Sequence, residues 1–276
     1  MKLCRFQING ETRNGVVADG FVTDRDQTDD RFPLDDVRFL APARPRKFLA
    51  IGLNYADHIA ESGMQAPEFP IFFNKQATCV VGPDDDVHMP RVSSLLDYEG
   101  ELAIVIGERC RHVTAEQAPD VIAGYTITND LSVRDWQLRT PTMTMGKSFD
   151  THGPLGPWIV TADELGDPHA LGIRTFVNGE QRQDGNTSEM VFNCFEQVAH
   201  LSQAFTLEPG DVIATGTPAG VGAVIQPFPE GLLKVGDVVR IEIDRIGALE
   251  NTVIEEPEGY VAPDAEAAAV RIGDNV

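Results

Sequence analysis

Two glutamates one residue apart are the most informative candidates for chemistry in this sequence of 276 residues. Glu99 and Glu101 come just before an apolar run, Leu102–Ile106, which has the composition of a buried strand. Positions i and i+2 of a strand share a face, so both carboxylates should project to one side, with Cα atoms about 6.5 to 7 Å apart. Two like charges at the mouth of a buried strand repel and are costly to desolvate unless a cation compensates. The pattern favours a divalent-ion site, and solvated glutamates at a strand end are the simpler alternative.

A third carboxylate follows a second apolar strand. The run Ile122–Asn129 ends abruptly in polar residues, and Asp130 comes next. Three carboxylates with no nearby histidine or cysteine set favour Mg²⁺ or Mn²⁺ over zinc, because these ions take oxygen donors and keep open positions. Taken alone, Asp130 is also explained as an aspartate at a strand end or helix cap.

A possible general base lies earlier in the chain. His58 and Glu61 are three residues apart, so a helical turn brings them onto one face, and a carboxylate that orients an imidazole raises its basicity. Asn54 is expected to cap this turn. An ordinary surface pair is the alternative for an isolated pattern of this kind.

Two loops complete the set of candidate segments. Lys147 lies in Gly- and Pro-rich surroundings, which suggest a rigid loop that could aim the ammonium inward, although a solvated lysine is the alternative. The Gly-rich segment 216–222 follows an apolar strand, but it lacks Gly-Lys-Ser/Thr, and Pro227 and Pro229 stand where a phosphate-binding loop needs a helix. Close approach of its backbone to a small ligand fits this segment better.

Composition limits the possible partners. The chain has 22 Lys and Arg against 43 Asp and Glu, a formal charge of −21, so nucleic acid and anionic membranes are not expected partners. Apolar runs stop at about five residues, whereas a membrane-spanning helix needs roughly 20. The first residues lack the apolar stretch of a signal peptide, and the four cysteines contain no Cys-x-x-Cys. We therefore expect a cytoplasmic protein with buried, reduced thiols.

The elements that must position these residues are mostly strands. The one long segment with helical periodicity is Met190–Phe205, preceded by the cap-forming residues Asn186, Thr187 and Ser188. The spacing of the strands does not match a βαβ series, so we predict a mainly β core with peripheral helices, an α+β fold. The predicted strands are Cys4–Ile8, Gly15–Val17, Gly20–Val22, Phe48–Gly52, Leu102–Ile106, Ile122–Asn129, Trp158–Thr161, Ile173–Val177, Val212–Thr215, Val238–Ile243 and Leu249–Ile254.

The chain is expected to have three parts. Residues 1–45 would form a small N-terminal β-rich module, residues 46–256 the catalytic domain, and residues 257–276 an acidic, loosely held tail.

Five motifs, in order between residues 45 and 256, resemble the fumarylacetoacetate hydrolase family. They are Asn-Tyr-Ala-Asp-His-Ile-Ala-Glu at 54–61, Asp-Tyr-Glu-Gly-Glu-Leu at 97–102, Asn-Asp at 129–130, Gly-Lys-Ser-Phe-Asp at 146–150 and Thr-Gly-Thr-Pro-Ala-Gly-Val-Gly at 215–222. The resemblance implies a mixed β-sandwich roll, usually a homodimer, with one Mg²⁺ or Mn²⁺ per subunit. Its substrates would be short 2-oxo acids.

The resemblance also implies roles for individual residues. By position, the metal ligands would be Glu99, Glu101 and Asp130, the catalytic residues His58, Glu61 and Lys147, and the substrate contacts Arg134, Gln137 and Thr217.

Several reactions are compatible with this family. We expect hydrolysis of a C–C bond in a β-diketo or 2-oxo acid, such as fumarylpyruvate or acetylpyruvate, in aromatic catabolism. The alternatives are a decarboxylase of oxaloacetate type, an isomerase or tautomerase of unsaturated 2-oxo dioates, and a metal-dependent binding protein without turnover. Kinship of fold does not choose among them.

Overall fold

A large mixed sheet runs through the molecule in residues 1–262, the part of the chain that the computed structural model describes. Its twelve strands follow the order β4-β3-β2-β1-β14-β12-β11-β17-β6-β7, with β5 beside β1 and β8 beside β14. The strands are β1 (Lys2–Ile8), β2 (Glu11–Ala18), β3 (Phe21–Asp24), β4 (Arg31–Pro33), β5 (Arg38–Leu40), β6 (Phe48–Gly52), β7 (Ile71–Lys75), β8 (Val80–Val81), β11 (Gly100–Ile106), β12 (Ile122–Asn129), β14 (Gly153–Thr161) and β17 (Val212–Ala214).

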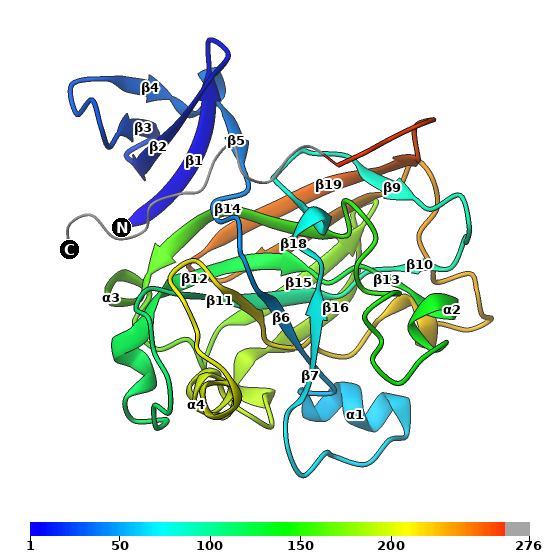
Figure 1. Cartoon of the computed structure of the whole chain (residues 1–276). Coiled ribbons are helices and arrows are strands. Elements are labelled where there is room, and N and C mark those ends of the chain that lie inside the picture. The colour runs from blue at the N-terminus through cyan, green and yellow to red at the C-terminus, as the bar shows by residue number, and fades with distance from the viewer. Residues whose placement is uncertain (263–276) are drawn as a thin grey trace.

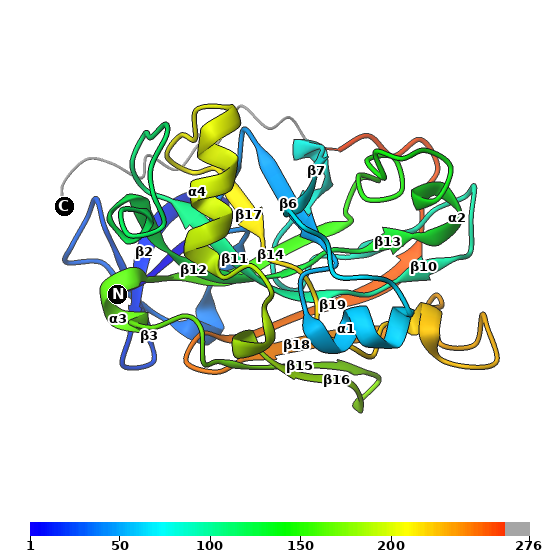
Figure 2. The same ribbon diagram turned by 90° about the horizontal axis from the view of Figure 1, so that it is seen from below.

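A second sheet of five strands packs against the central part of the first. Its order is β16-β15-β18-β19-β9, and Figure 2 shows β15, β16, β18 and β19 below β11, β12 and β14. Apolar side chains from both sheets, among them Ile104, Ile127 and Ile241, join in one buried cluster. The predicted mainly β sandwich is therefore confirmed. The strands are β9 (Val87–Met89), β15 (Gly172–Val177), β16 (Glu180–Asn186), β18 (Val238–Ile243) and β19 (Gly247–Glu255), and a separate pair is formed by β10 (Leu96–Asp97) and β13 (Ser132–Val133).

The N-terminal strands extend the large sheet at one end. Strand β1 pairs antiparallel with β14, with Lys2 opposite Val160 and Leu3 opposite Ile159. Strands β1 to β5 project from the body of the molecule in Figure 1 and enclose a small apolar cluster around Phe6. The proposed boundary at residue 45 stays a prediction, and most of the predicted tail, residues 263–276, lies outside the described residues.

Helices are few and lie at the periphery (Figure 1). The predicted long helix exists as α4, but Asn186, Thr187 and Ser188 do not cap it. The N-cap is Asn193, whose side chain accepts hydrogen bonds from the amides of Phe195 and Glu196. The helices are α1 (Ala56–Ser62), α2 (Arg134–Gln137), α3 (Ala162–Leu165) and α4 (Cys194–Ala204), with 3₁₀ turns at Leu34–Asp36, Ala77–Cys79, Ala118–Val121, Thr187–Glu189 and Gly222–Val224.

Asn54 is also placed differently from its predicted role. The residue before α1 is Tyr55, which makes no side-chain capping bond. The Asn54 amide instead donates to the carbonyls of Phe192 and Thr215 and accepts from the Phe192 amide. Asn54 thus holds the start of α1 to two distant loops.

The longest helix in the described residues is α4, with 11 residues. No helix in residues 1–262 is long and apolar enough to cross a membrane. All four cysteines are buried and unpaired.

Candidate active site

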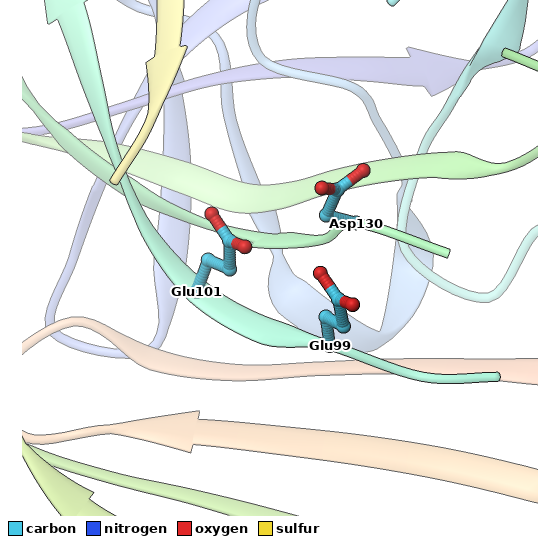
Figure 3. A group of neighbouring side chains, drawn as sticks. All are labelled: Glu99, Glu101 and Asp130. Atoms are coloured by element: carbon cyan, nitrogen blue, oxygen red, sulfur yellow. The ribbon is translucent and has the colours of Figure 1, made fainter. Parts of the chain in front are cut away.

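Three carboxylates converge where β11 and β12 run side by side. Glu99 precedes β11, Glu101 lies within it, and Asp130 follows β12. The strands are antiparallel, with Gly100 opposite Asn129, so the start of one strand meets the end of the other. Each carboxylate offers an oxygen within 4.8 Å of the other two, and all three residues are buried. Figure 3 shows the three side chains close together, with Glu99 and Glu101 projecting to one side of their strand, as their spacing predicted.

The backbone around these carboxylates is fixed by short hydrogen bonds. The Glu99 amide donates to Asn129 Oδ1 at 3.0 Å, and the Asp130 amide donates to the Glu99 carbonyl at 2.8 Å. Gly100 lets the second sheet approach this strand, because a Cβ atom there would lie 2.3 Å from Thr175 Oγ1. We call Glu99, Glu101 and Asp130 the acidic triad.

Two buried lysines compensate part of the negative charge. Lys147 Nζ lies 2.6 Å from Glu99 Oε2 and 2.8 Å from Asp130 Oδ2. Lys75 Nζ lies 2.6 Å from Asp130 Oδ1. Sequence reasoning missed Lys75, although it sits two residues after the buried Phe73 in β7 and therefore shares the inward face of that strand.

The two glutamates of the acidic triad differ in electrostatic environment. Burial opposes ionisation of Glu99, but Lys147 and Arg134 outweigh it and lower the pKa of this carboxyl to about 2. Burial raises the pKa of Glu101 well above its usual range, and the neighbouring Asp130 and Glu99 raise it further. Glu101 accepts one hydrogen bond, from the Gly216 amide at 2.8 Å. It is therefore the carboxylate whose charge is least compensated.

The acidic triad fits a hard divalent cation. It offers only carboxylate oxygens, the donors that Mg²⁺ and Mn²⁺ prefer. A positive group already bridges two of its members, because the Lys147 ammonium contacts both Glu99 and Asp130. Glu99, Glu101 and Asp130 are thus the residues that would hold such an ion.

The predicted dyad is formed in α1. His58 Nδ1 lies 2.7 Å from Glu61 Oε1, and both side chains are largely buried. The Gly220 amide donates to both Glu61 oxygens, at 3.1 and 3.0 Å, and the Ala219 amide donates to Asp57 Oδ2 at 3.2 Å. Helix α1 is therefore docked on the Gly-rich loop 215–222, which fixes the carboxylate that orients the imidazole.

The dyad lies within electrostatic reach of Glu99 in the acidic triad. His58 is near enough to Glu99 to contribute, after the two cationic residues, to the lowering of its pKa. A candidate base thus lies near a candidate metal site, and that combination suits general-base chemistry on a metal-bound substrate.

The Gly-rich loop contacts the acidic triad through a backbone amide, that of Gly216. Gly216 has φ +100°, and a Cβ atom there would lie 2.7 Å from Asn54 Cβ, so glycine lets the loop pass close to the start of α1. The sequence predicted close approach of this backbone to a small ligand. In the structure, amides of this loop donate to protein carboxylates, and the one at Gly216 donates to Glu101.

Arg134 and Gln137, predicted to contact substrate, lie beside the acidic triad in α2. Arg134 Nη1 is 2.7 Å from Glu99 Oε1 and donates to Gln137 Oε1 at 2.9 Å, while its Nε donates to Asp97 Oδ2 at 2.8 Å. Asp97, which sequence reasoning did not single out, also accepts hydrogen bonds from the amides of Gly222 and Ala223. This buried carboxylate ties Arg134 to the Gly-rich loop.

Thr217, the third predicted substrate contact, is hydrogen-bonded to two protein groups. Its hydroxyl donates to the Gly100 carbonyl at 2.9 Å and accepts from Gln183 Nε2 at 2.8 Å. Gln183, in β16, also accepts from the Gly100 amide at 3.0 Å. Gln183 lies in a polar strand with no evident motif, so the sequence offered nothing to identify it.

Comparison with known proteins gives a consistent result over most of the chain. The family model for the fumarylacetoacetate (FAA) hydrolase C-terminal domain matches residues 47–254, and a model described as Rv2993c-like, N-terminal, matches residues 1–42. A mitochondrial oxaloacetate tautomerase, fahd2, from Xenopus laevis is 46% identical over 222 residues, which cover 79% of this chain and 69% of that protein.

Solved structures are similar over nearly the whole chain. A 5-carboxymethyl-2-hydroxymuconate delta-isomerase from Mycobacterium smegmatis has a TM-score of 0.83 and 40% identity, covering 94% of this chain and 100% of that one. A fumarylacetoacetate hydrolase from Exiguobacterium antarcticum has a TM-score of 0.85 and 38% identity, covering 93% and 100%.

Proposed function

Because this chain belongs to the fumarylacetoacetate hydrolase family, we propose that it is a metal-dependent hydrolase that cleaves a C–C bond in an acylpyruvate-type 2-oxo acid. Fumarylpyruvate and acetylpyruvate represent this substrate class. The cofactor would be one Mg²⁺ or Mn²⁺ per subunit, and the enzyme would be a homodimer. Small 2-oxo acids, rather than nucleic acid or membranes, would be its partners.

The observation that carries this proposal is the contact between the dyad and the Gly-rich loop. The Gly220 amide fixes Glu61, and Glu61 in turn holds His58 Nδ1 at 2.7 Å. If Nδ1 carries the proton, Nε2 of the ring is left as the proton acceptor. A binding protein without turnover would have no need of an oriented base of this kind.

Each residue of the candidate site would have a separate role in hydrolysis. A bound divalent cation would supply Lewis acidity toward the carboxylate and 2-oxo oxygens of the substrate. His58 would take a proton from the water that attacks the more distant carbonyl, a contribution typically worth about 10² to 10⁴ in rate. Lys147 and Arg134 bring positive charge that would stabilise the developing oxyanion. Glu61 would keep the imidazole in position throughout.

The test is a substrate panel assayed with and without Mg²⁺ or Mn²⁺. It contains acetylpyruvate, fumarylpyruvate, oxaloacetate and an unsaturated 2-oxo dioate. We expect metal-dependent release of pyruvate from an acylpyruvate, falling at least 10²-fold in His58→Gln while metal binding is kept. A fully active His58→Gln enzyme, or no acylpyruvate turnover by the wild type, would contradict the proposal.

An isomerase or tautomerase of 2-oxo dioates is the second candidate. It is favoured by the names of two relatives, the Xenopus tautomerase and the Mycobacterium isomerase. In that reaction His58 would move a proton on the carbon beside the 2-oxo group, so the dyad would still be required. Incorporation of solvent deuterium without C–C cleavage would identify this reaction.

A decarboxylase of oxaloacetate type would behave differently. Decarboxylation needs stabilisation of an enolate and no general base, so it would survive in His58→Gln and would disappear in Glu101→Gln.

A further inference from the structure

A cavity of about 970 Å³ lies away from the candidate active site. Its walls come from the end of β5 and the segment 41–46 that follows it, from the segment 77–88, and from the loop 208–210. None of the nine residues assigned above to catalysis, substrate or metal lines it.

The cavity is rich in arginine although the chain as a whole carries a formal charge of −21. The arginines that line it are Arg5, Arg38, Arg44 and Arg46. Two of the acidic residues in its wall already have cationic partners. Asp85 pairs with Arg38. Glu208 pairs at 3.3 Å with Lys47, the residue that precedes β6. The third acidic wall residue, Asp86, is exposed, and none of the three forms an ion pair with Arg5 within residues 1–262.

Arg5 is the residue that most needs an anion. It is only 2% exposed, and its Nη1 donates to the Ala41 carbonyl at 2.9 Å. Its Nη2 has no hydrogen-bond partner among residues 1–262. Burial, and then the nearby positive charge of Arg44, lower the pKa of Arg5 to about 10. A buried guanidinium with an unused donor is costly unless an anion compensates it.

We propose that this cavity binds a small organic carboxylate through Arg5, with Arg46 at its exposed rim. A guanidinium pairs well with a carboxylate because its planar donors match two oxygens. The wall also contains apolar residues, among them Ala43, Val81 and Leu40, which offer contact to a carbon skeleton that inorganic phosphate lacks.

Two sources could supply the carboxylate. One is a free organic acid of low molecular weight. The other is the chain itself, because Tyr260 and Ala262 line the cavity and the sequence continues from there with Asp264 and Glu266. In both cases the group bound by the Arg5 guanidinium would be a carboxylate.

The test is calorimetric titration of the full-length protein with succinate, and separately with inorganic phosphate. We expect succinate to bind, and to bind at least tenfold more weakly to Arg46→Gln and to Arg5→Met. Arg46 is exposed, so its substitution does not threaten the fold, and melting curves would report whether Arg5→Met folds. Arg240→Gln, which removes an exposed charge outside the cavity, is the matched control and should bind succinate normally.

Two comparisons locate the bound anion. Succinate bound at the candidate active site would be lost in Arg134→Gln and kept in the cavity variants, a result that would overturn the proposal. Equal binding by wild type and both cavity variants, or tighter binding of phosphate than of succinate, would overturn it as well. So would a failure of succinate to bind both the wild type and the variant Asp264→Asn, Glu266→Gln.

The double substitution Asp264→Asn, Glu266→Gln distinguishes the sources. A severalfold gain in succinate affinity would show that the chain's own carboxylates compete for the cavity. Unchanged affinity would assign it to a free acid.

Discussion

Glu101 has a single amide donor to offset its charge, whereas Asp130 contacts two lysine ammonium groups. This asymmetry predicts opposite effects of two matched substitutions in protein freed of metal by chelation and dialysis. Glu101→Gln should raise the stability at pH 7, because it removes a carboxyl whose ionisation is opposed by burial and by its acidic neighbours in the folded state but not in the unfolded chain. Asp130→Asn should lower it, because Lys75 and Lys147 would lose a charged partner.

Thermal melting checks this prediction. We expect Glu101→Gln to gain about 1 kcal/mol or more, a rise of about 2 to 4 °C per kcal/mol for a chain of this size. A lower melting temperature for Glu101→Gln than for the wild type would show that the Gly216 amide alone compensates this carboxylate.

His152 provides a prediction of pH dependence. It is fully buried, its Nε2 lies 2.8 Å from the His88 carbonyl, and burial lowers its pKa to about 3. In the unfolded chain its pKa is about 6.5. Between these values the unfolded state binds a proton that the folded state does not, so stability falls as the pH drops below about 6.5, by up to about 1.4 kcal/mol per unit.

Denaturant unfolding between pH 7 and pH 4 measures this contribution. His152→Gln should be less stable than the wild type at pH 7, because it disturbs a packed site, but its stability should fall less steeply with acid. Parallel pH curves for the two proteins would mean that His152 does not contribute to acid unfolding.

At the scale of elements, the start of β11 depends on the close approach of the second sheet. A Cβ atom on Gly100 would lie 2.3 Å from Thr175 Oγ1 and 3.2 Å from Ile241 Cγ2. Gly100→Ala should therefore cost about 1 to 3 kcal/mol, the usual range for overpacking, and should weaken metal binding by shifting Glu99 and Glu101. Urea unfolding and metal titration measure the two effects.

A double-mutant cycle tests the cause. Thr175→Ala removes the nearest clashing atom, so Gly100→Ala with Thr175→Ala should be more stable than the sum of the single effects predicts. Strict additivity would place the strain elsewhere.

The same element shows how much of the fold and site could be read from the sequence. The apolar runs that became β11 and β12 were predictable because burial on both faces removes polar residues, and the i, i+2 spacing placed Glu99 and Glu101 together. Strand β16 (Glu180–Asn186) was missed because it is polar and Gly-containing, with a partly exposed face. Its contribution to the site, Gln183, became visible only through pairing with distant segments.

The N-terminal caps of the helices also could not be predicted from residue type alone. Cap-forming residues stand both at Asn186–Ser188 and at Asn193, so composition alone could not choose where α4 begins. The capping box between Asn193 and Glu196 decides it. Asn54 was misread for a related reason. The side chain of an asparagine beside a helix can bond either to the first amides of that helix or to distant backbone groups, and residue type does not say which. Here Asn54 bonds to the distant carbonyls of Phe192 and Thr215.

At the scale of the whole molecule, the candidate metal site joins parts that are far apart in the sequence. The acidic triad lies in the large sheet, Gln183 links Gly100 to the second sheet, and α1 docks on the Gly-rich loop beside it. A cation that binds the folded chain and not the unfolded one stabilises the whole sandwich by linkage.

Metal addition should therefore raise the stability of the entire chain. Mn²⁺ or Mg²⁺ at one hundred times its dissociation constant should add about 2.7 kcal/mol, which corresponds to about 5 to 10 °C in melting temperature. The shift should persist in His58→Gln, which leaves the acidic triad intact, and vanish in Glu101→Gln. Differential scanning calorimetry of the three proteins with and without metal measures it. If Glu101→Gln shows the wild-type shift, the cation binds elsewhere, because its stabilisation would then not depend on the carboxylate that most requires a positive charge.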